Sequence, residues 1–345
     1  MSTLNAKDST NTTPIDIACL STLYKAAGDE LRLHILRVMQ RDAFGVLELA
    51  QIFAIRQPAM SHHLKVLAKA GLVVTRKEGT FIFYRRNIND GSEAAVFRAQ
   101  ILQQIDACPL PTAISAEVAK IHEQRAKTST AFFRFNTEGF RQQQDLIASY
   151  ALYGDAVLEL LEPDRQKGAE SILEIGPGEG ELLTALAPRF KHVFALDNSS
   201  VMLARAKSLV GEALARHIHF ILGEAGTSAT TDIQVDCATL NMVLHHITSP
   251  AETLHNIYQL LKPGGSLIIT ELCQHDQDWV REACGDIWLG FCPEELSIWA
   301  KESHFVEGES VYMAQRNGFR IQLRKFYKPI HKATRNNPPP SNQRG

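Results

Sequence analysis

Hydrophobic and polar residues follow two different rhythms along the chain. Between residues 20 and 70, apolar positions recur every three or four residues, which predicts short amphipathic helices. From residue 171 onwards, short apolar runs alternate with helical stretches, which predicts a doubly wound parallel sheet. The predicted strands are residues 172–175, 193–196, 218–222, 235–240 and 266–270. The pattern therefore predicts an α/β protein, and its 345 residues are enough for two domains.

The first rhythm contains two helices joined by a turn, followed by a hairpin. Pro58 stands in the first turn of the second helix, a position that favours proline. The apolar residues of this helix repeat at helical spacing: Met60, Leu64 and Leu67. Residues 72–77 and 80–86 flank a turn with Gly79 and predict a β-hairpin. This order predicts a winged helix-turn-helix domain.

Polar side chains occupy the other face of the second helix, as expected for a recognition helix in the major groove. With the cations of the hairpin, the candidate DNA contacts are Gln57, Ser61, His62, Lys65, Arg76, Lys77 and Arg85. Residues 56–86 contain seven cations and one anion, a net charge of +6, although the whole chain carries −2. Such an island indicates contact with a polyanion or, alternatively, a solvated helix face.

This region resembles the ArsR-type winged-helix repressors in three segments: G-D-E-L-R-L-H-I-L, Q-P-A-M-S-H-H-L-K-V-L-A-K-A-G-L-V and R-K-E-G-T-F-I-F-Y-R. The resemblance implies a homodimer formed through residues 20–27 and 94–105. It also implies a palindromic operator in double-stranded DNA, with half-sites about one helical turn apart. Metal-sensing members often carry paired cysteines where residues 46–53 lie here, and this stretch has no cysteine. We therefore expect no metal site there.

A run of three glycines follows the first strand of the second rhythm. Residues 171–180 read S-I-L-E-I-G-P-G-E-G, and a helix is expected to begin at Glu181. A strand, a glycine turn and a helix N-terminus place backbone N–H groups beside a ligand. The dinucleotide fingerprint would need glycine at position 181. The spacing E-x-G-x-G-x-G, with Asp197 at the end of the next strand, instead resembles motif I of class I S-adenosylmethionine-dependent methyltransferases.

This second resemblance implies a Rossmann-like, seven-stranded sheet with a terminal antiparallel hairpin. The Asn317-Gly318 pair is a strong turn signal for that hairpin, and residues 261–265 are expected to form the turn before the fifth strand. The implied ligand is S-adenosylmethionine or S-adenosylhomocysteine, with Asp197 placed to accept hydrogen bonds from the ribose hydroxyls. The candidate cofactor-binding residues are Glu174, Gly176, Gly178, Gly180, Asp197, Asn198, Met202, Glu224, Ala225 and Asn241.

These predictions divide the chain into five parts. We predict a disordered N-terminus (1–14), a winged-helix domain (15–105), a helical connector or lid (106–163), a methyltransferase domain (164–328) and a disordered tail (329–345). Phe140, Tyr150 and Tyr153 of the connector either line the ligand pocket or pack between domains. The apolar-rich residues 279–305 are expected to cover the entrance for a methyl acceptor.

Two functions stay open at this point. The first is a DNA-binding transcriptional regulator whose methyltransferase-like domain binds the cofactor as a small-molecule effector. The alternative is an active methyltransferase on a small molecule, since methyl transfer can proceed largely by holding the nucleophile in line. His245 and His246 are the candidate general bases of such an enzyme.

A third possibility is a thiolate cluster that binds trivalent arsenic through Cys273, Cys284 and Cys292, although their spacing matches no ligand pattern. We expect no other metal site. The six scattered cysteines are interpreted as reduced thiols. Since no run of eighteen apolar residues and no apolar signal core occur, we expect a cytoplasmic protein without a membrane partner.

Overall fold

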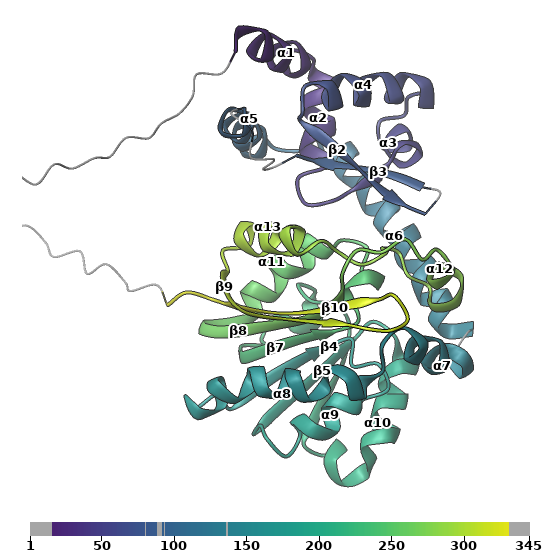
Figure 1. Ribbon diagram of the computed structural model, residues 1–345, viewed down its shortest axis with the longest axis vertical. Coiled ribbons are helices and arrows are strands. Elements are labelled where there is room, and N and C mark those ends of the chain that lie inside the picture. The colour runs from purple at the N-terminus through teal and green to yellow at the C-terminus, as the bar shows by residue number, and fades with distance from the viewer. Residues whose placement is uncertain (1–15, 80, 88–91, 93, 136, 331–345) are drawn as a thin grey trace, which may run out of the picture. The chain divides into compact units, whose positions relative to one another are not determined.

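The computed structural model divides into two compact units (Figure 1). It describes residues 16–79, 81–87, 92, 94–135 and 137–330, without the side chains of residues 128–135, 137–142 and 282. Unit 1 comprises Met1–Thr137, His246–Glu252 and His275–Leu289, and unit 2 comprises Glu138–His245, Thr253–Gln274 and Gly290–Gly345. The disorder predicted for residues 1–14 and for all but the start of the tail lies outside the described residues.

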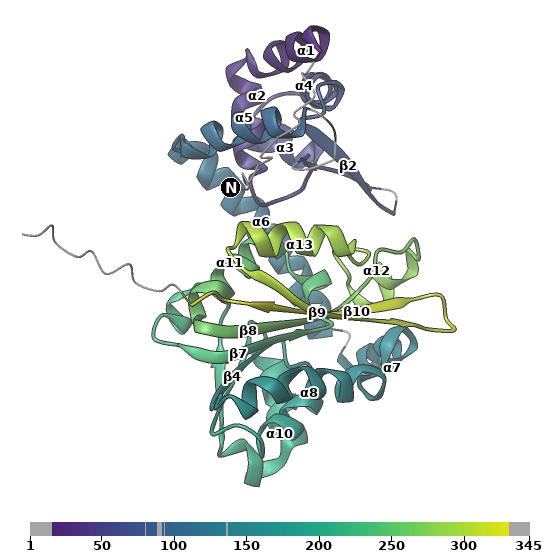
Figure 2. The same ribbon diagram turned by 60° about the vertical axis from the view of Figure 1, so that its left-hand side comes forward.

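Unit 1 contains the predicted winged helix-turn-helix. Its helices are α1 (Ile17–Ala27), α2 (Glu30–Val38), α3 (Val46–Ile52), α4 (Gln57–Lys69), α5 (Ala95–Ala107) and α6 (Thr112–Phe135). A three-stranded sheet joins β1 (Phe44–Gly45), β3 (Phe81–Arg86) and β2 (Val73–Glu78) in that order. Figure 2 shows the hairpin that carries β2 extending from the helices as a wing.

Local sequence explains these elements. Asp29 caps α2, because its Oδ1 accepts a hydrogen bond of 2.9 Å from the Arg32 backbone N–H. Met60, Leu64 and Leu67 of α4 are completely buried in the core of unit 1, as their spacing predicts. The α4 helix therefore has one face fixed in the core and the opposite face available to solvent.

Two further segments fold with unit 1, although the predicted domain scheme places them in the methyltransferase domain. They are His246–Glu252 and His275–Leu289, the second of which contains α12 (Trp279–Cys284). Helix α6 also clusters with unit 1 rather than standing apart as a connector. Within the predicted connector, the apolar pattern of residues 142–161 predicts one helix, and this is wrong, because extended backbone at Ser149 separates α7 (Thr137–Ala148) from α8 (Tyr150–Gln166).

Unit 2 contains the predicted seven-stranded sheet, in the order β6-β5-β4-β7-β8-β10-β9. The parallel strands are β4 (Ser171–Ile175), β5 (His192–Asp197), β6 (Ile218–Leu222), β7 (Val235–Asn241) and β8 (Leu261–Leu272). The antiparallel pair is β9 (Val306–Ala314) and β10 (Arg320–Tyr327). Together with the helix-turn-helix of unit 1, this sheet confirms the predicted fold class.

Helices cover both faces of the sheet in unit 2. Figure 1 shows α8, α9 (Glu181–Leu186) and α10 (Ser200–Ala215) on one face, with α11 (Pro250–Leu260) and α13 (Pro293–Glu302) on the other. All five residues of the central strand β4 are buried, which explains its nearly continuous apolar sequence. The short 3₁₀ helices are η1 (Ser228–Thr230) and η2 (Leu244–His246).

The sequence predicts two turns next to the last strands of the sheet, one at Asn317-Gly318 and one at residues 261–265. The Asn317-Gly318 turn is confirmed, since Gln315 N–H donates to Phe319 O and Gly318 has a φ of +89°. The predicted turn at residues 261–265 falls inside β8, where the pairing with β7 shifts register between Leu261 and Ser266 and Gly264 has a φ of +84°. These residues belong to β8, because Gly264 N–H donates to Lys328 O and Lys328 N–H donates to Gly265 O, extending the strand pairing.

Candidate functional site

The glycine loop after β4 forms a backbone cradle at the carboxyl edge of the sheet in unit 2. Gly176, Gly178 and Gly180 all have positive φ, at +64°, +55° and +92°. A Cβ at Gly176 would lie 2.2 Å from Val243 Cγ2, and one at Gly180 would lie 2.9 Å from the Ala206 backbone. At Gly178, by contrast, no atom of the described residues lies within 4 Å of such a Cβ. The loop therefore packs closely at both ends and leaves open space at its centre.

Glu174 is a buried carboxylate beside this loop. It is 2% exposed, and its Oε2 has no hydrogen-bond partner among the residues that the structure describes. Burial raises the pKa of Glu174 to about 8. An unsatisfied buried carboxylate is costly, so a ligand that brings a donor or a cation to Glu174 would bind with a favourable contribution.

The end of β5 supplies a second carboxylate. Burial raises the pKa of Asp197 to about 6, although its Oδ1 accepts a 2.7 Å hydrogen bond from Ser199 N–H. The Ser199 hydroxyl in turn caps α10 by accepting from Met202 N–H. Asn198 Nδ2 donates to Glu224 Oε1 at 2.9 Å, so these two exposed candidates are joined. The third predicted member of this side, Ala225, accepts a hydrogen bond from Asn256 through its carbonyl.

Asn241 at the end of β7 is fixed by the neighbouring strand. Its Oδ1 accepts a 2.7 Å hydrogen bond from the Thr270 hydroxyl, and Met242 N–H donates to Thr270 O. Met242 has a φ of +54°, which is uncommon for a side chain of this size and marks a tight turn after the strand. Glu174, Asp197 and Asn241 thus lie at or next to the carboxyl ends of three neighbouring strands, at the edge where open α/β sheets bind ligands.

His245 forms a buried pair with Glu271, a residue that the sequence analysis does not single out. Its Nδ1 lies 2.6 Å from Glu271 Oε1, and its backbone N–H donates to Glu271 Oε2. His245 is 2% exposed and Glu271 is completely buried. A carboxylate on Nδ1 fixes the orientation and tautomer of an imidazole, which is the arrangement that a general base needs.

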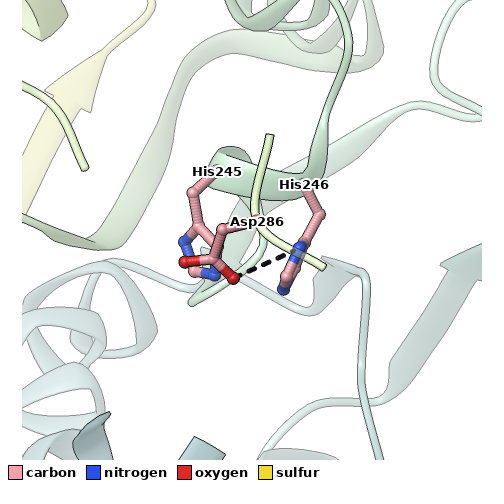
Figure 3. Close-up of side chains that lie close together, drawn as sticks. All are labelled: His245, His246 and Asp286. Atoms are coloured by element: carbon pink, nitrogen blue, oxygen red, sulfur yellow. Dashed lines mark ion pairs between the residues drawn. The ribbon is translucent and has the colours of Figure 1, made fainter. Parts of the chain in front are cut away.

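His246 belongs to unit 1 and lies beside Asp286. Its Nδ1 is 3.8 Å from Asp286 Oδ1 and 3.4 Å from Gly285 O. Figure 3 shows these side chains together with His245, which directly precedes His246. Since Glu271 holds Nδ1 of His245, only Nε2 of that ring remains for any other partner.

Tyr150 and Tyr153 are the aromatic candidates on α8, and the charge of Glu174 affects the pKa of both. Burial raises the pKa of both Tyr150 and Tyr153, and the negative charge of Glu174 raises each of them further. The two rings are in edge contact, with centroids 5.8 Å apart. Tyr150 is half-buried and Tyr153 is buried, so Tyr150 is the better placed of the two to meet a ligand.

The cysteine alternative is not supported by the positions of the thiols. Cys273 and Cys284 are buried, and burial raises the pKa of both thiols, to about 12 for Cys284. Binding of arsenic or a metal requires the thiolate, which such burial disfavours.

The recognition helix α4 presents most of its predicted DNA contacts. Gln57, His62 and Lys65 are exposed, and Ser61 is half-buried. Leu64, between them in sequence, points into the core, so the polar residues share the outer face. This arrangement agrees with the expected reading face of a helix-turn-helix.

The wing differs from the prediction in one cation. Lys77 is exposed and Arg85 is half-buried, but Arg76 is only 6% exposed and is paired with Glu78. Its guanidinium carbon also lies 5.3 Å from the centroid of the Trp288 ring. The prediction of Arg76 as a DNA contact therefore does not fit its burial, because the side chain is used inside unit 1.

The basic island is also smaller than its sequence implies. Arg86 is buried and bonds Asp106 through both terminal nitrogens, at 2.7 and 3.0 Å, while its Nε donates to Leu36 O. The Arg86 charge is therefore neutralised by Asp106 of α5 inside the fold. The exposed cations of the island are Arg56, Lys65, Lys69 and Lys77.

Comparisons with known proteins agree with both parts of the chain. A family model described as a methyltransferase domain matches residues 141–322, more than half of the chain, and a helix-turn-helix domain model matches residues 27–76. An uncharacterized methyltransferase of Mycobacterium tuberculosis is 29% identical over 142 residues, covering 39% of this chain and 68% of the relative. A ubiquinone/menaquinone biosynthesis C-methyltransferase of Ruegeria is 25% identical over 139 residues, 39% of this chain and 54% of the relative.

Solved structures give matches over about half of the chain. The N-methyltransferase NodS from Bradyrhizobium japonicum, in complex with S-adenosyl-L-homocysteine, is 21% identical over 55% of this chain and 98% of NodS, with a TM-score of 0.41. Magnesium protoporphyrin IX methyltransferase from Synechocystis is 16% identical over 59% of this chain and 99% of that one, with a TM-score of 0.48. On the match to residues 141–322, the chain belongs to the methyltransferase-domain family, and it also carries an N-terminal helix-turn-helix domain.

Proposed function

We propose that the chain is an ArsR-type DNA-binding regulator whose methyltransferase-like domain binds S-adenosylmethionine or S-adenosylhomocysteine as its effector. The observation that carries the proposal is the composition of unit 1. Segments His246–Glu252 and His275–Leu289 fall within the methyltransferase match, yet they fold with the helix-turn-helix. An enzyme with a merely appended DNA-binding domain would not need its own loops to build that domain.

The ligand part of the proposal rests on the cradle in unit 2. Glu174 offers an unsatisfied carboxylate oxygen, and Gly178 leaves open space at the centre of the loop. Asp197 is the last residue of β5, where an acid accepts hydrogen bonds from ribose hydroxyls. These residues fit an adenosine ligand whose zwitterionic amino-acid end offers an ammonium group. S-adenosylmethionine would bring an activated methyl group on its sulfonium, and S-adenosylhomocysteine would not.

The DNA part rests on the exposed face of α4 and on Lys77 of the wing. Gln57 and His62 suit contacts to base edges, while Lys65 and Lys77 suit contacts to phosphates. A protein that neutralises several phosphates loses affinity steeply as salt rises. A flat salt dependence would therefore argue against the DNA assignment.

A homodimer through α1 and α5 is part of the proposal. Ile17 and Tyr24 of α1 and Val96 of α5 are large apolar residues with exposed side chains, and the Tyr24 and Phe97 rings are in edge contact. Apolar side chains gathered on two helices of one unit favour association of two copies. Sedimentation equilibrium tests this directly: twice the chain mass supports the dimer, and a monomer at micromolar concentration contradicts it.

The proposed function is tested by measuring DNA affinity and methyl transfer side by side. Binding to the DNA upstream of the protein's own gene would be titrated with S-adenosylmethionine and, separately, with S-adenosylhomocysteine. A change in DNA affinity with either ligand supports the regulator. Unchanged affinity with both bound ligands, together with turnover of a methyl acceptor, would favour the enzyme.

The second candidate, an active methyltransferase, is favoured by the His245–Glu271 pair. Glu271 holds His245 in one orientation, as a carboxylate does for a catalytic imidazole. The experiment is release of S-adenosylhomocysteine from S-adenosylmethionine with candidate acceptors that carry a hydroxyl or amine proton. Loss of that activity in His245→Ala, with ligand affinity retained, would assign His245 as the base.

A further inference from the structure

Two segments of unit 1 are covalent continuations of the methyltransferase sheet. His246–Glu252 follows β7 and η2, and His275–Leu289 follows β8. Both segments therefore leave the sheet at the carboxyl ends of strands, the end at which the glycine loop also leaves β4. Within unit 1 these segments contact the wing.

Glu78, the last residue of β2, is the centre of these contacts. It is completely buried, and its Oε1 accepts a hydrogen bond from Arg76 Nε. Its Oε2 accepts from Arg281 Nη2 at 3.0 Å and from Leu289 N–H at 2.7 Å. A buried carboxylate with this set of donors loses much of its stabilisation if one donor leaves. The contact therefore favours two discrete states, fully formed or broken, over a continuous range of partly formed ones.

Trp288 completes the contact and joins the two segments. Its ring packs edge-on against Phe83 of β3, with centroids 5.1 Å apart, and lies 5.3 Å from the Arg76 guanidinium carbon. Its Nε1–H donates to Ile247 O at 2.8 Å. We call Arg76, Glu78, Phe83, Arg281, Trp288 and Leu289 the wing clasp.

The residues that lead into the clasp are in contact with the cradle inside unit 2. Gly176 packs so closely against Val243 that an added Cβ would lie 2.2 Å from Val243 Cγ2, so the glycine loop is in contact with the residues that follow β7. The His245–Glu271 and Met242–Thr270 hydrogen bonds tie the exits of β7 and β8 to each other. A ligand that displaces the glycine loop therefore shifts both exits, and the clasp segments begin one and four residues beyond His245 and Glu271.

We propose that the wing clasp is the element through which occupancy of the glycine cradle changes DNA affinity. This rests on the proposed regulator function. Arg76 and Glu78 lie on one face of β2, and Lys77 between them points to the other face and is exposed. The clasp thus holds one face of the wing and leaves the phosphate-binding side open. Making or breaking it changes how well the wing is held for DNA, which is a two-state element that a ligand can bias.

The test combines hydrogen exchange of the wing with DNA binding, in the full chain. S-adenosylhomocysteine is the probe, and exchange is followed at residues 73–78 and 81–86. The clasp variants are Arg281→Gln and Trp288→Phe. The matched controls are Arg316→Gln, an exposed arginine in the β9–β10 turn, and Trp279→Phe, a 40% exposed tryptophan in the same segment as Trp288.

We expect the ligand to change wing exchange in the wild type and to change DNA affinity by a factor within about 5–150. In the clasp variants both responses fall below about threefold, while ligand affinity by calorimetry stays within about threefold of wild type. The controls respond like the wild type. The proposal is overturned if the ligand leaves wild-type wing exchange unchanged, or if clasp and control variants respond alike.

The same data separate the clasp from the regulator function. Wing exchange that responds to the ligand only when the clasp is intact, with DNA affinity that does not respond, would reject the proposed function and the effect on DNA, and would leave only a link from the cradle to the wing. DNA affinity that responds to the ligand equally in all variants would support the regulator and reject the clasp. The wild-type exchange measurement needs no variant, so it decides the question even if a clasp variant fails to fold.

Discussion

One buried glutamate lies in the glycine cradle and another in the wing clasp, the two sites that the proposal connects. Their hydrogen-bonding surroundings are opposite. Glu174 of the cradle has an oxygen without a partner among the described residues, and burial raises its pKa to about 8. Glu78 of the wing accepts from Arg76, Arg281 and the Leu289 backbone. A buried carboxylate in need of donors suits a ligand site, whereas one surrounded by donors holds parts of the fold together.

The largest effect that separates the two glutamates is expected for Glu78→Gln. The variant leaves Arg76 and Arg281 without their buried carboxylate, which costs about 3–5 kcal/mol when one partner of a buried pair is lost. The free energy of unfolding of unit 1 should fall by that amount, measured by native-state hydrogen exchange of α4. The control Glu123→Gln removes a solvent-exposed pair with Lys127 of α6, also in unit 1, and should leave the free energy of unfolding nearly unchanged. Equal costs would contradict the account.

A change in the cradle should act on ligand affinity instead. In Gly176→Ala, the new Cβ meets Val243 at 2.2 Å and the residue is held at a φ of +64°. We expect about a hundredfold loss of S-adenosylhomocysteine affinity by calorimetry, equal to about 2.7 kcal/mol. Gly168→Ala is the control, because Gly168 also has positive φ but open space around it. Its ligand affinity should match the wild type, and a similar loss there would contradict the cradle.

Glu174→Gln should have the opposite sign from Glu78→Gln at alkaline pH. The pKa of Glu174 is about 8 in the folded state, above its unfolded value near 4.5. Between these two pH values Glu174 is ionised in the unfolded state but not in the folded state. The free energy of unfolding of the wild type therefore falls as pH rises, by on the order of 1 kcal/mol per pH unit. The glutamine variant lacks this loss, so without ligand it should be the more stable protein at pH 8. Thermal unfolding from pH 5 to 9 checks this, and parallel curves would contradict it.

The smallest effect is expected on the reading surface. Lys65→Gln removes one exposed cation from α4 and should weaken DNA binding by about tenfold or less, with the salt slope reduced by about one. The control Lys207→Gln removes an exposed cation from α10 in unit 2. Fluorescence anisotropy at several salt concentrations gives both values. If the two variants bind DNA equally well, α4 is not the reading helix.

The cradle was predictable because its determinants are local in sequence. The strand, the three glycines and the first residue of the helix all lie within eleven consecutive residues. Gly176, Gly178 and Gly180 have positive φ, a conformation that glycine adopts without steric cost. The seven-stranded sheet with its terminal antiparallel hairpin was also predictable, from alternating apolar runs and from the resemblance to a known family. What stayed hidden was Glu271, since a lone acid inside an apolar strand gives no sign of the histidine that it holds.

The wing was less predictable because its partners are distant. Arg76 reads as a surface cation, and nothing near it in sequence shows that Trp288 and Arg281 bury the network around it. Arg86 is likewise neutralised by Asp106, twenty residues away. Charge counts along a sequence do not separate cations that face solvent from cations that bind inside the fold.

The most direct test of the central claim is the affinity of the protein for its own upstream DNA, measured by fluorescence anisotropy with and without saturating S-adenosylhomocysteine. The account predicts that the ligand changes the Kd by at least about fivefold. An identical Kd in both conditions, with ligand binding verified by calorimetry, would contradict it.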